Sequence, residues 1–111
     1  MQQPEAIEND EQNALDGSAL QAEIAAAADD TERERILREA VRTQTATILD
    51  LTVVEDDSNF LEQGLTSLKA LELTRNLMTL TNVEVPLVAV IEYPTPSQLA
   101  KYMVEAMNDA G

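Results

Sequence analysis

The sequence predicts a small all-α protein: a four-helix bundle of three main helices and one short helix, with a long loop between the first two main helices. Three observations indicate this class. Apolar residues recur at helical spacing in three segments, and a Thr stands at the start of each, where a helix cap is expected. The chain holds one Phe, two Tyr and no Trp. Its core must therefore be built mainly from Leu, Ile, Val and Ala, which favours packed helices over a sheet sandwich.

The 111 residues carry a net charge of −14 and include neither Cys nor His, which excludes several classes of protein. The charge disfavours nucleic acid and anionic membranes as partners and favours basic protein surfaces. Without Cys or His the chain has no disulfide, no thiol nucleophile and no Ser-His-Asp triad. Residues 1–5 lack the basic start of a signal peptide, and no apolar run is long enough to span a membrane. We therefore expect one small cytoplasmic domain without a metal site.

Residues 1–30 form an acidic segment with eight Asp or Glu and no Lys or Arg. This composition predicts a mostly disordered linker or tail, with the folded domain over residues 31–109. Within the segment, Ser18 and Gln21 have the spacing of a capping box ahead of residues 22–28, so a short helix that docks a neighbouring protein is the alternative. By itself such a helix would be too short to be stable.

The first main helix is expected from about Thr31 to Leu49. Thr31 and Glu34 are spaced as a capping box, and nearby acids complement the positive end of the helix dipole. One stripe of the helix is apolar and consists of Leu37, Ala40, Val41, Ile48 and Leu51. Its arginines occupy other faces and are interpreted as a solvated surface, with Glu34 and Arg38 in i,i+4 register. A specific binding role for these arginines is the less favoured alternative.

Residues 50–65 lose the helical period and form the long loop. A connection of this length in a small domain is uncommon unless it is functional or anchored by its own apolar residues. The candidates for anchoring are Val53, Val54, Phe60 and Leu61. Asp56 and Asp57 raise the alternative of a calcium loop. Calcium binding is disfavoured because the alternating acids and closing glutamate of an EF-hand are missing.

The second main helix is expected over residues 67–80. Its buried stripe should consist of Ala70, Leu73, Leu77 and Leu80. Leu68 and Leu71 then point largely the other way. Two exposed leucines one turn apart favour a surface that recognises a partner, although broader helix packing that half-buries them is the alternative. Asn82 can close the helix because Asn tolerates the left-handed conformation.

Residues 85–91 are strand-like by propensity, but the sequence has no second strand-like run to pair with them. A loop with one helical turn is therefore predicted. The last main helix starts with Thr95 as N-cap, Pro96 at the first position and Gln98 at the third, and it runs to about residue 107. Its buried side should consist of Leu99, Tyr102, Met103 and Ala106.

The stretch before the second helix combines an aromatic residue expected to be buried, a glycine turn and a hydroxyl at a helix start. Gly64 can adopt a positive φ, and Thr66 is a good N-cap. Ser67 then occupies the first helical position, where its hydroxyl projects from the positive end of the helix toward a partner. Taken alone, a serine at this position is an ordinary helix-start residue.

From about Thr31 to Met107 the chain resembles the acyl carrier protein domains, above all those of modular polyketide synthases. In that family the signature Asp-x-x-Phe-x-x-x-Gly-x-Asp-Ser-Leu precedes the second helix. The matching positions here are Asp57, Phe60, Gly64, Ser67 and Leu68. Residues 70–73 are similar to the polyketide-type second helix, and residues 85–86 and 92–96 to the entries of the third and fourth helices. Three signatures in the right order and spacing make the resemblance specific.

The resemblance implies that Ser67 is esterified by 4′-phosphopantetheine from coenzyme A, and that the terminal thiol carries the growing acyl chain as a thioester. It implies a carrier that is not an enzyme. The implied partners are a phosphopantetheinyl transferase, a ketosynthase, an acyltransferase and other synthase domains. The residues expected to recognise partners are Glu62, Leu65, Thr66, Leu68, Leu71, Glu72 and Arg75. A chain without His or Cys fits this role because the transferase must supply the base and the metal that activate the hydroxyl.

Two positions depart from the patterns of related carriers. Thr66 stands where the family usually has Asp, which preserves the N-cap but removes an anionic contact, so docking is affected more than attachment. Peptidyl carriers often have His there, which is also absent. Carriers that serve β-branching enzymes tend to have Trp six residues after the serine, whereas Leu73 stands at that position, so β-branching is not predicted.

Three other functions compete with this hypothesis. A peptidyl carrier of a nonribosomal synthetase would use the same attachment chemistry. An unmodified acidic helical adaptor would bind one basic protein through the same leucines. A serine hydrolase is disfavoured because no plausible base lies near Ser67. We expect the chain to be a monomer excised from a larger synthase, with the acidic segment as an interdomain linker.

Overall fold

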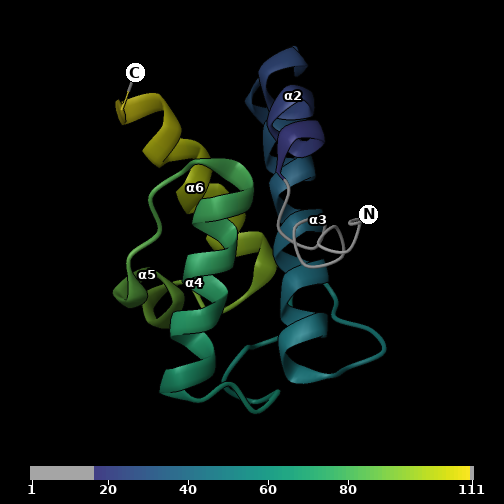
Figure 1. The fold of residues 1–111 in the computed structure, drawn as a ribbon, viewed down its shortest axis with the longest axis vertical. Helices are drawn as coiled ribbons and strands as arrows, with labels where there is room; N and C mark the ends of the chain where they lie inside the picture. Colours follow the sequence, from purple (N-terminus) through teal and green to yellow (C-terminus); the bar gives the residue numbers. More distant parts are fainter. Residues whose placement is uncertain (1–16, 111) are drawn as a thin grey trace, which may run out of the picture.

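The structure is a computed structural model that describes residues 17–110, so the predictions for residues 1–16 lie outside it. The described part of the chain contains helices and no strand. Its elements are α2 (Ser18–Ala26), α3 (Asp30–Leu49), α4 (Ser67–Thr81), α5 (Leu87–Glu92) and α6 (Pro96–Ala110). The main helices α3, α4 and α6 and the short α5 form the predicted four-helix bundle, to which α2 is added (Figure 1).

The helix ends follow from local sequence, with two corrections. The N-cap of α3 is Asp29, whose Oδ1 accepts the N–H of Glu32 at 3.0 Å, so the prediction of Thr31 as cap is wrong by two residues. Asp caps a helix at least as well as Thr, and its charge also complements the dipole. The cap of α6 is confirmed, since Thr95 Oγ1 accepts the N–H of Gln98 at 3.1 Å. Asn82 ends α4 with a φ of 61°, as predicted.

Helix α2 is the second correction: within residues 17–30, part of the segment expected to be mostly disordered, the chain forms a short helix, as the alternative interpretation allowed. Its N-cap is Gly17 rather than Ser18. The side chain of Gln21 donates from Nε2 to the carbonyl of Leu80 at 3.3 Å instead of completing a capping box. Ile24 is only 4% exposed and belongs to the core cluster. A short helix gains stability from tertiary packing that it lacks alone, so the folded unit begins before the predicted boundary at residue 31.

Gly17 allows α2 to approach α4 closely. A Cβ atom at this position would lie 2.2 Å from the carbonyl oxygen of Leu80, a separation that real Cβ atoms do not adopt. Because the obstacle is backbone, any side chain here would have to push the two helices apart. On the other side α2 packs against α3 and covers Ile36, a buried residue that the predicted apolar stripe did not include.

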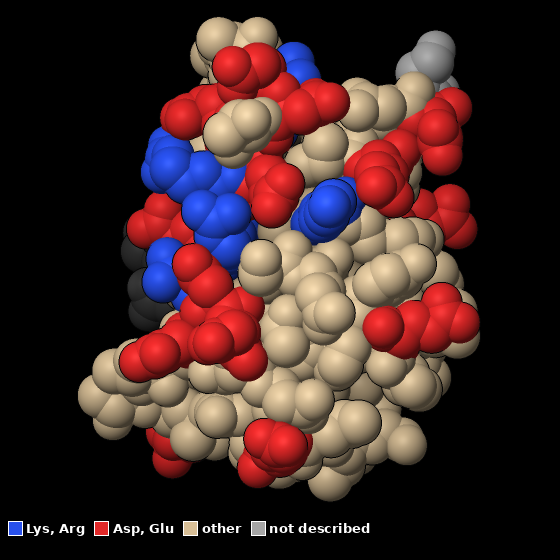
Figure 2. Space-filling model, turned by 180° about the vertical axis from the view of Figure 1, so that it is seen from behind, with Lys and Arg blue, Asp and Glu red and all other residues tan. Residues whose placement is uncertain are grey.

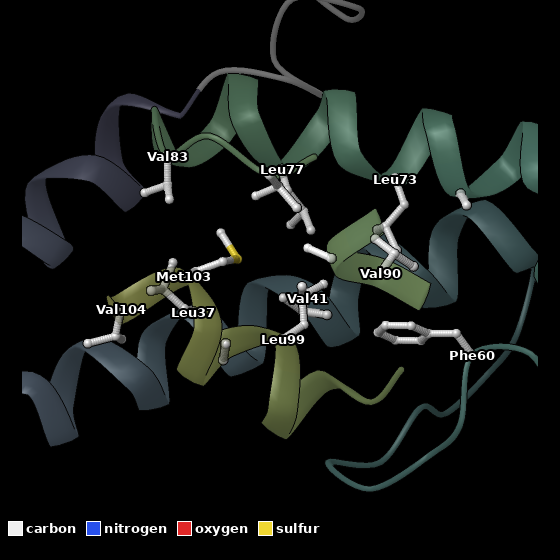
Figure 3. Close-up of a cluster of buried hydrophobic side chains, with 14 of the residues drawn as sticks. Leu37, Val41, Phe60, Leu73, Leu77, Val83, Val90, Leu99, Met103 and Val104 are labelled. Atoms are coloured by element: carbon white, nitrogen blue, oxygen red, sulfur yellow. The ribbon is translucent and has the colours of Figure 1, made fainter. Parts of the chain in front are cut away.

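One continuous core joins the helices and the long loop. Figure 3 shows side chains from α3, α4, α5 and α6 meeting in its centre, with Phe60 reaching in from the loop. The predicted stripe of α4 is confirmed, since its four residues are all buried. The loop is anchored by only two of the four expected residues: Val54 and Phe60 are buried, whereas Val53 and Leu61 are exposed. Each exposed residue adjoins a buried one, because a loop on the surface of the bundle has one inward side.

Candidate functional site

Ser67 lies at the start of α4, exposed to solvent, as the first helical residue. The residue before it is extended, with φ −97° and ψ 170°, and makes the predicted cap: Thr66 Oγ1 accepts the N–H of Lys69 at 3.2 Å. Among the described residues, no acceptor pairs with the N–H groups of Ser67 and Leu68. These free donors and the helix dipole make the surroundings of the Ser67 hydroxyl suitable for a negatively charged group.

The turn that precedes Ser67 is fixed by backbone hydrogen bonds around a buried ring. The N–H of Phe60 donates to the carbonyl of Pro94 at 2.7 Å, and the carbonyl of Phe60 accepts the N–H of Leu65 at 3.0 Å. Gly64 has a φ of +104°, and a Cβ there would meet no atom within 4 Å. Glycine is therefore needed at this turn for its backbone conformation rather than for space.

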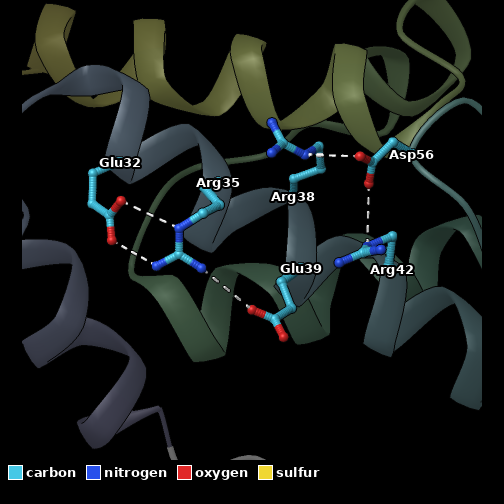
Figure 4. Close-up of polar contacts among 6 residues, drawn as sticks. All are labelled: Glu32, Arg35, Arg38, Glu39, Arg42 and Asp56. Carbon is cyan, nitrogen blue, oxygen red and sulfur yellow. Dashed lines mark hydrogen bonds and ion pairs between the residues drawn. The ribbon is translucent and has the colours of Figure 1, made fainter.

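Asp56 ties the same loop to two helices. Its carboxylate lies 3.2 Å from Arg38 Nε and 3.3 Å from Arg42 Nε, both on α3 (Figure 4). Its carbonyl accepts the N–H of Ser97 of α6 at 2.9 Å. The sequence indicated only the pairing of Arg38 with Glu34, which is present at 3.6 Å. A contact between residues so far apart along the chain leaves no periodic signal, so the anchoring role of Asp56 could not be read from the sequence.

Lys69 connects the start of α4 to the end of α3. Its Nζ donates to the carbonyl of Ile48 at 3.3 Å, in the last turn of α3. A cation at a helix C-terminus is favourable because the carbonyl groups there carry partial negative charge. The helix that presents Ser67 is thus held in place by a hydrogen bond at the same end.

An exposed apolar surface borders Ser67, as predicted from the helix period. Leu68 is 76% exposed and Leu71 is 39% exposed. The polar residues predicted beside them, Glu62, Thr66, Glu72 and Arg75, are also exposed. The inclusion of Leu65 is wrong, because this residue is only 7% exposed and belongs to the core. It follows the Gly64 turn, which directs the chain back into the bundle before α4 begins.

Helix α5 adds two residues that the sequence reasoning missed. Val88 and Ile91 are more than half exposed, whereas Ala89 and Val90 are buried, and α5 packs against α4. The signal was present in the sequence: a short helix on the surface cannot bury every residue of an apolar run, and residues three apart share one face. We define the docking face as eight exposed residues that precede α4 or lie on α4 and α5, namely Glu62, Thr66, Leu68, Leu71, Glu72, Arg75, Val88 and Ile91.

The surroundings of Ser67 provide no catalytic group of the usual kind. The chain has no His and no Cys. Among the described residues no group of Asp and Glu side chains is arranged to hold a metal ion.

On α3, hydrogen bonds from Arg35 hold the pKa of Glu32 below its usual range, and the contact also raises the pKa of Arg35. No helix of the described part is long and apolar enough to cross a membrane.

Comparison with known proteins gives consistent results in sequence and in fold. The family model described as "Phosphopantetheine attachment site" matches residues 37–103. The polyketide synthase GfsB of Streptomyces halstedii is 34% identical over 94 residues, and the spectinabilin polyketide synthase system protein NorA′ of Streptomyces orinoci is 39% identical over 93 residues. These alignments cover 82% and 81% of this chain but only 2% of either relative, so the chain corresponds to a small part of each synthase.

Solved structures of carrier domains have a similar fold. An A1-type ACP domain from module 5 of MLSA1 superposes with a TM-score of 0.71 at 27% identity, over 81% of this chain and 92% of that domain. A free-standing peptidyl carrier protein from Acinetobacter baumannii gives a TM-score of 0.62 at 28% identity, over 67% of this chain and 95% of that protein. With the family match, the sequence relatives and the fold in agreement, the chain belongs to the phosphopantetheine-attachment family, as a non-catalytic acyl carrier domain most like those of modular polyketide synthases.

Proposed function

We propose that Ser67 bears the 4′-phosphopantetheine arm of this carrier, and that its cargo is a polyketide intermediate handed between the domains of a synthase. The observation that supports this most directly is the placement of Ser67 as an exposed hydroxyl at the first position of α4, inside the matched residues 37–103. A buried Ser67 would have been incompatible with attachment.

The described residues fit the attached group. In the loading reaction the Ser67 oxygen forms a bond to the phosphorus of the arm while the pyrophosphate bond of coenzyme A breaks. Adenosine 3′,5′-bisphosphate leaves, and the hydroxyl proton passes to a base of the transferase. The phosphodiester that results is anionic, and the free N–H groups of Ser67 and Leu68 favour negative charge there. Once attached, the arm supplies a terminal thiol that holds the acyl group as a thioester. The carrier itself contributes a fixed position for the arm and a surface for partners.

The docking face supports the hand-over between partners. Exposed leucines follow Ser67 on α4, and α5, which packs against α4, also carries exposed aliphatic residues, so a partner that reaches the hydroxyl meets apolar surface on α4. The face is small and mixed in charge, which suits transient contacts, because a tight complex would slow release through a low dissociation rate. Its expected partners are the phosphopantetheinyl transferase, a ketosynthase and an acyltransferase. Thr66 keeps the N-cap without offering these partners the negative charge of an Asp.

Intact mass spectrometry tests the attachment site. The chain is incubated with coenzyme A and a broad-specificity phosphopantetheinyl transferase, and the mass gain of one arm is measured. We expect the gain in the unaltered chain and none in the Ser67→Ala variant. The matched control is Ser97→Ala, which removes a serine from the first turn of α6 and should leave loading unchanged. Loading of Ser67→Ala would overturn the assignment, and no loading of the unaltered chain would favour the unmodified adaptor.

The cargo is tested separately with the loaded chain. The sequence relatives named above are polyketide synthases, which favours a polyketide over a peptidyl cargo. We expect the arm to accept a malonyl-type unit from an acyltransferase and to pass an acyl chain to and from a ketosynthase. Acceptance of an aminoacyl group from an adenylation domain, without transfer by the acyltransferase, would show a peptidyl carrier instead.

A further inference from the structure

A second surface, away from α4, has the features of a protein-binding groove. It lies where the segment between α4 and α5 runs past the C-terminal half of α6, on the left side of Figure 1. The groove has a volume of about 570 Å³ and includes Glu84, Pro86, Tyr93, Tyr102, Glu105 and Asp109 in its lining. None of the described residues that line it belongs to α4 or to the docking face.

Two stacked tyrosines form the wall of this groove. The ring centroids of Tyr93 and Tyr102 are 5.3 Å apart, and their planes differ by 24°. Tyr93 follows α5 and is 36% exposed, whereas Tyr102 of α6 is half-buried against the core. The stack therefore packs against the core through Tyr102 and is open to solvent at Tyr93. Aromatic faces of this kind attract cations, and planar cations can also stack on them.

Three carboxylates border the tyrosines without a positive partner. Glu84, Glu105 and Asp109 are exposed, and none of them makes an ion pair within residues 17–110. The ion pairs of the described chain all involve arginines of α3. Figure 2 shows the same asymmetry, with basic side chains at the left and centre of that view and only acidic ones along its right edge.

The arrangement of these acids indicates the kind of occupant. Among the described residues no group of carboxylates is placed to hold a metal ion, so a single divalent cation does not fit. Carboxylates spread along an aromatic wall instead match an extended segment with cationic side chains. Arginine suits the groove better than lysine, because its planar guanidinium can stack on a tyrosine while it donates to a carboxylate.

We propose that the groove defined by Glu84, Tyr93, Tyr102, Glu105 and Asp109 is a second docking site, and that it binds an arginine-bearing segment of a partner protein. The site does not depend on Ser67 or on its modification. It would let a partner hold the carrier on one side while the docking face remains free for another enzyme. Its charge would also speed the encounter with a basic partner.

Binding of short peptides tests the proposal on the complete unmodified chain. The probe is an acetylated and amidated peptide, Gly-Arg-Leu-Arg-Gly, compared with its analogue in which lysine replaces both arginines. Chemical shifts of the ¹⁵N-labelled carrier are followed during titration. We expect the largest shifts at residues that line the groove, and binding of the arginine peptide about threefold or more tighter than the lysine peptide. Shifts spread evenly over all acidic surfaces, or equal affinity for both peptides, would overturn the proposal.

Variants separate the groove from the general acidity of the chain. Glu105→Gln combined with Asp109→Asn removes two exposed charges, and we expect it to weaken arginine-peptide binding about tenfold. The control is Glu55→Gln in the long loop, an exposed acid that lies in neither the groove nor the docking face, and it should change binding less than about twofold. Tyr102→Leu keeps every charge and should abolish the preference for arginine, with folding verified by circular dichroism. An effect of Glu55→Gln as large as that of the double variant would refute the site, and because Ser67 is unmodified throughout, that result would not affect the proposed function.

Discussion

The arginines on the outward faces of α3 and α4 differ in whether they form ion pairs with carboxylates of the domain. On α3, each of the four arginines lies within 4 Å of a carboxylate of the same domain. Arg35 contacts Glu32 at 2.6 Å, and Arg42 contacts Asp56 at 3.3 Å. On α4, Arg75 is exposed and makes no ion pair among the described residues, and it lies on the same helix as the exposed Leu68 and Leu71.

This difference indicates which surface is available to partners. A charge that is already paired gains little from a second partner, because the new contact must replace the old one. The arginine face of α3 is therefore used within the molecule, where it fixes the loop through Asp56. The docking face of α4 and α5 has unpaired polar groups and exposed apolar area, so a partner can add contacts there without breaking any. The following variants test that contrast, beginning with the largest effect.

Alanine substitutions of two leucines of α4 compare the interior of the bundle with the docking face. Leu73 is fully buried, so Leu73→Ala leaves a cavity and should lower the free energy of unfolding by about 2–5 kcal/mol. Leu71 is 39% exposed, and Leu71→Ala should cost less than about 1.5 kcal/mol. Urea denaturation measures both. Equal losses would show that Leu71 belongs to the core and would remove it from the docking face.

The same position also tests docking itself. Leu71→Asp should retain the helix content of the chain, because an exposed carboxylate on α4 requires no burial. It should nevertheless slow the loading of Ser67 by the transferase, because an apolar contact is replaced by a charge. Circular dichroism and the rate of mass gain report the two properties separately. Loading at the rate of the unaltered chain would show that this transferase does not use Leu71.

Substitutions of Asp56 in the loop and Arg75 on α4 compare a charge that forms ion pairs within the domain with a charge that forms none among the described residues. Asp56→Asn removes the charge that pairs with Arg38 and Arg42, and the Arg42 Nε is buried with no hydrogen-bond partner among the described residues. We expect a loss of about 1 kcal/mol in the free energy of unfolding, less at high salt. Arg75→Gln should leave stability unchanged within about 0.5 kcal/mol. Thermal unfolding at two salt concentrations measures both, and a larger loss for Arg75→Gln would contradict the contrast.

The sequence alone predicted the features that depend on neighbouring residues. The cap by Thr66, the left-handed Asn82, the positive φ of Gly64 and the buried stripe of α4 all follow from local rules, and the structure confirms them. The placement of Ser67 at an exposed helix start follows from the same rules.

Features that depend on distant residues were missed or mistaken. The docking of α2 depends on the fit of Gly17 against Leu80, which composition cannot reveal. The acidic composition of residues 1–30 instead favoured disorder. An average over a segment does not reveal that one residue, Ile24, is buried in the core. The burial of Leu65 likewise depends on the direction of the chain after the Gly64 turn, which is a property of the assembled bundle.

The smallest effect concerns pH and the exposed pair of Glu32 and Arg35. The hydrogen bond from Arg35 lowers the pKa of Glu32 below its ordinary value of 4.5, so the folded state favours the charged carboxylate. The pair therefore adds stability above the unfolded pKa, and this is lost as the pH falls through the lower folded pKa. Glu32→Gln should be slightly less stable than the unaltered chain at neutral pH and equal to it in acid. Urea denaturation from about pH 7 to about pH 3 measures the difference. A difference that grows in acid would contradict the sign, and one as large as that for Asp56→Asn would mean that an exposed pair stabilises as much as the loop anchor.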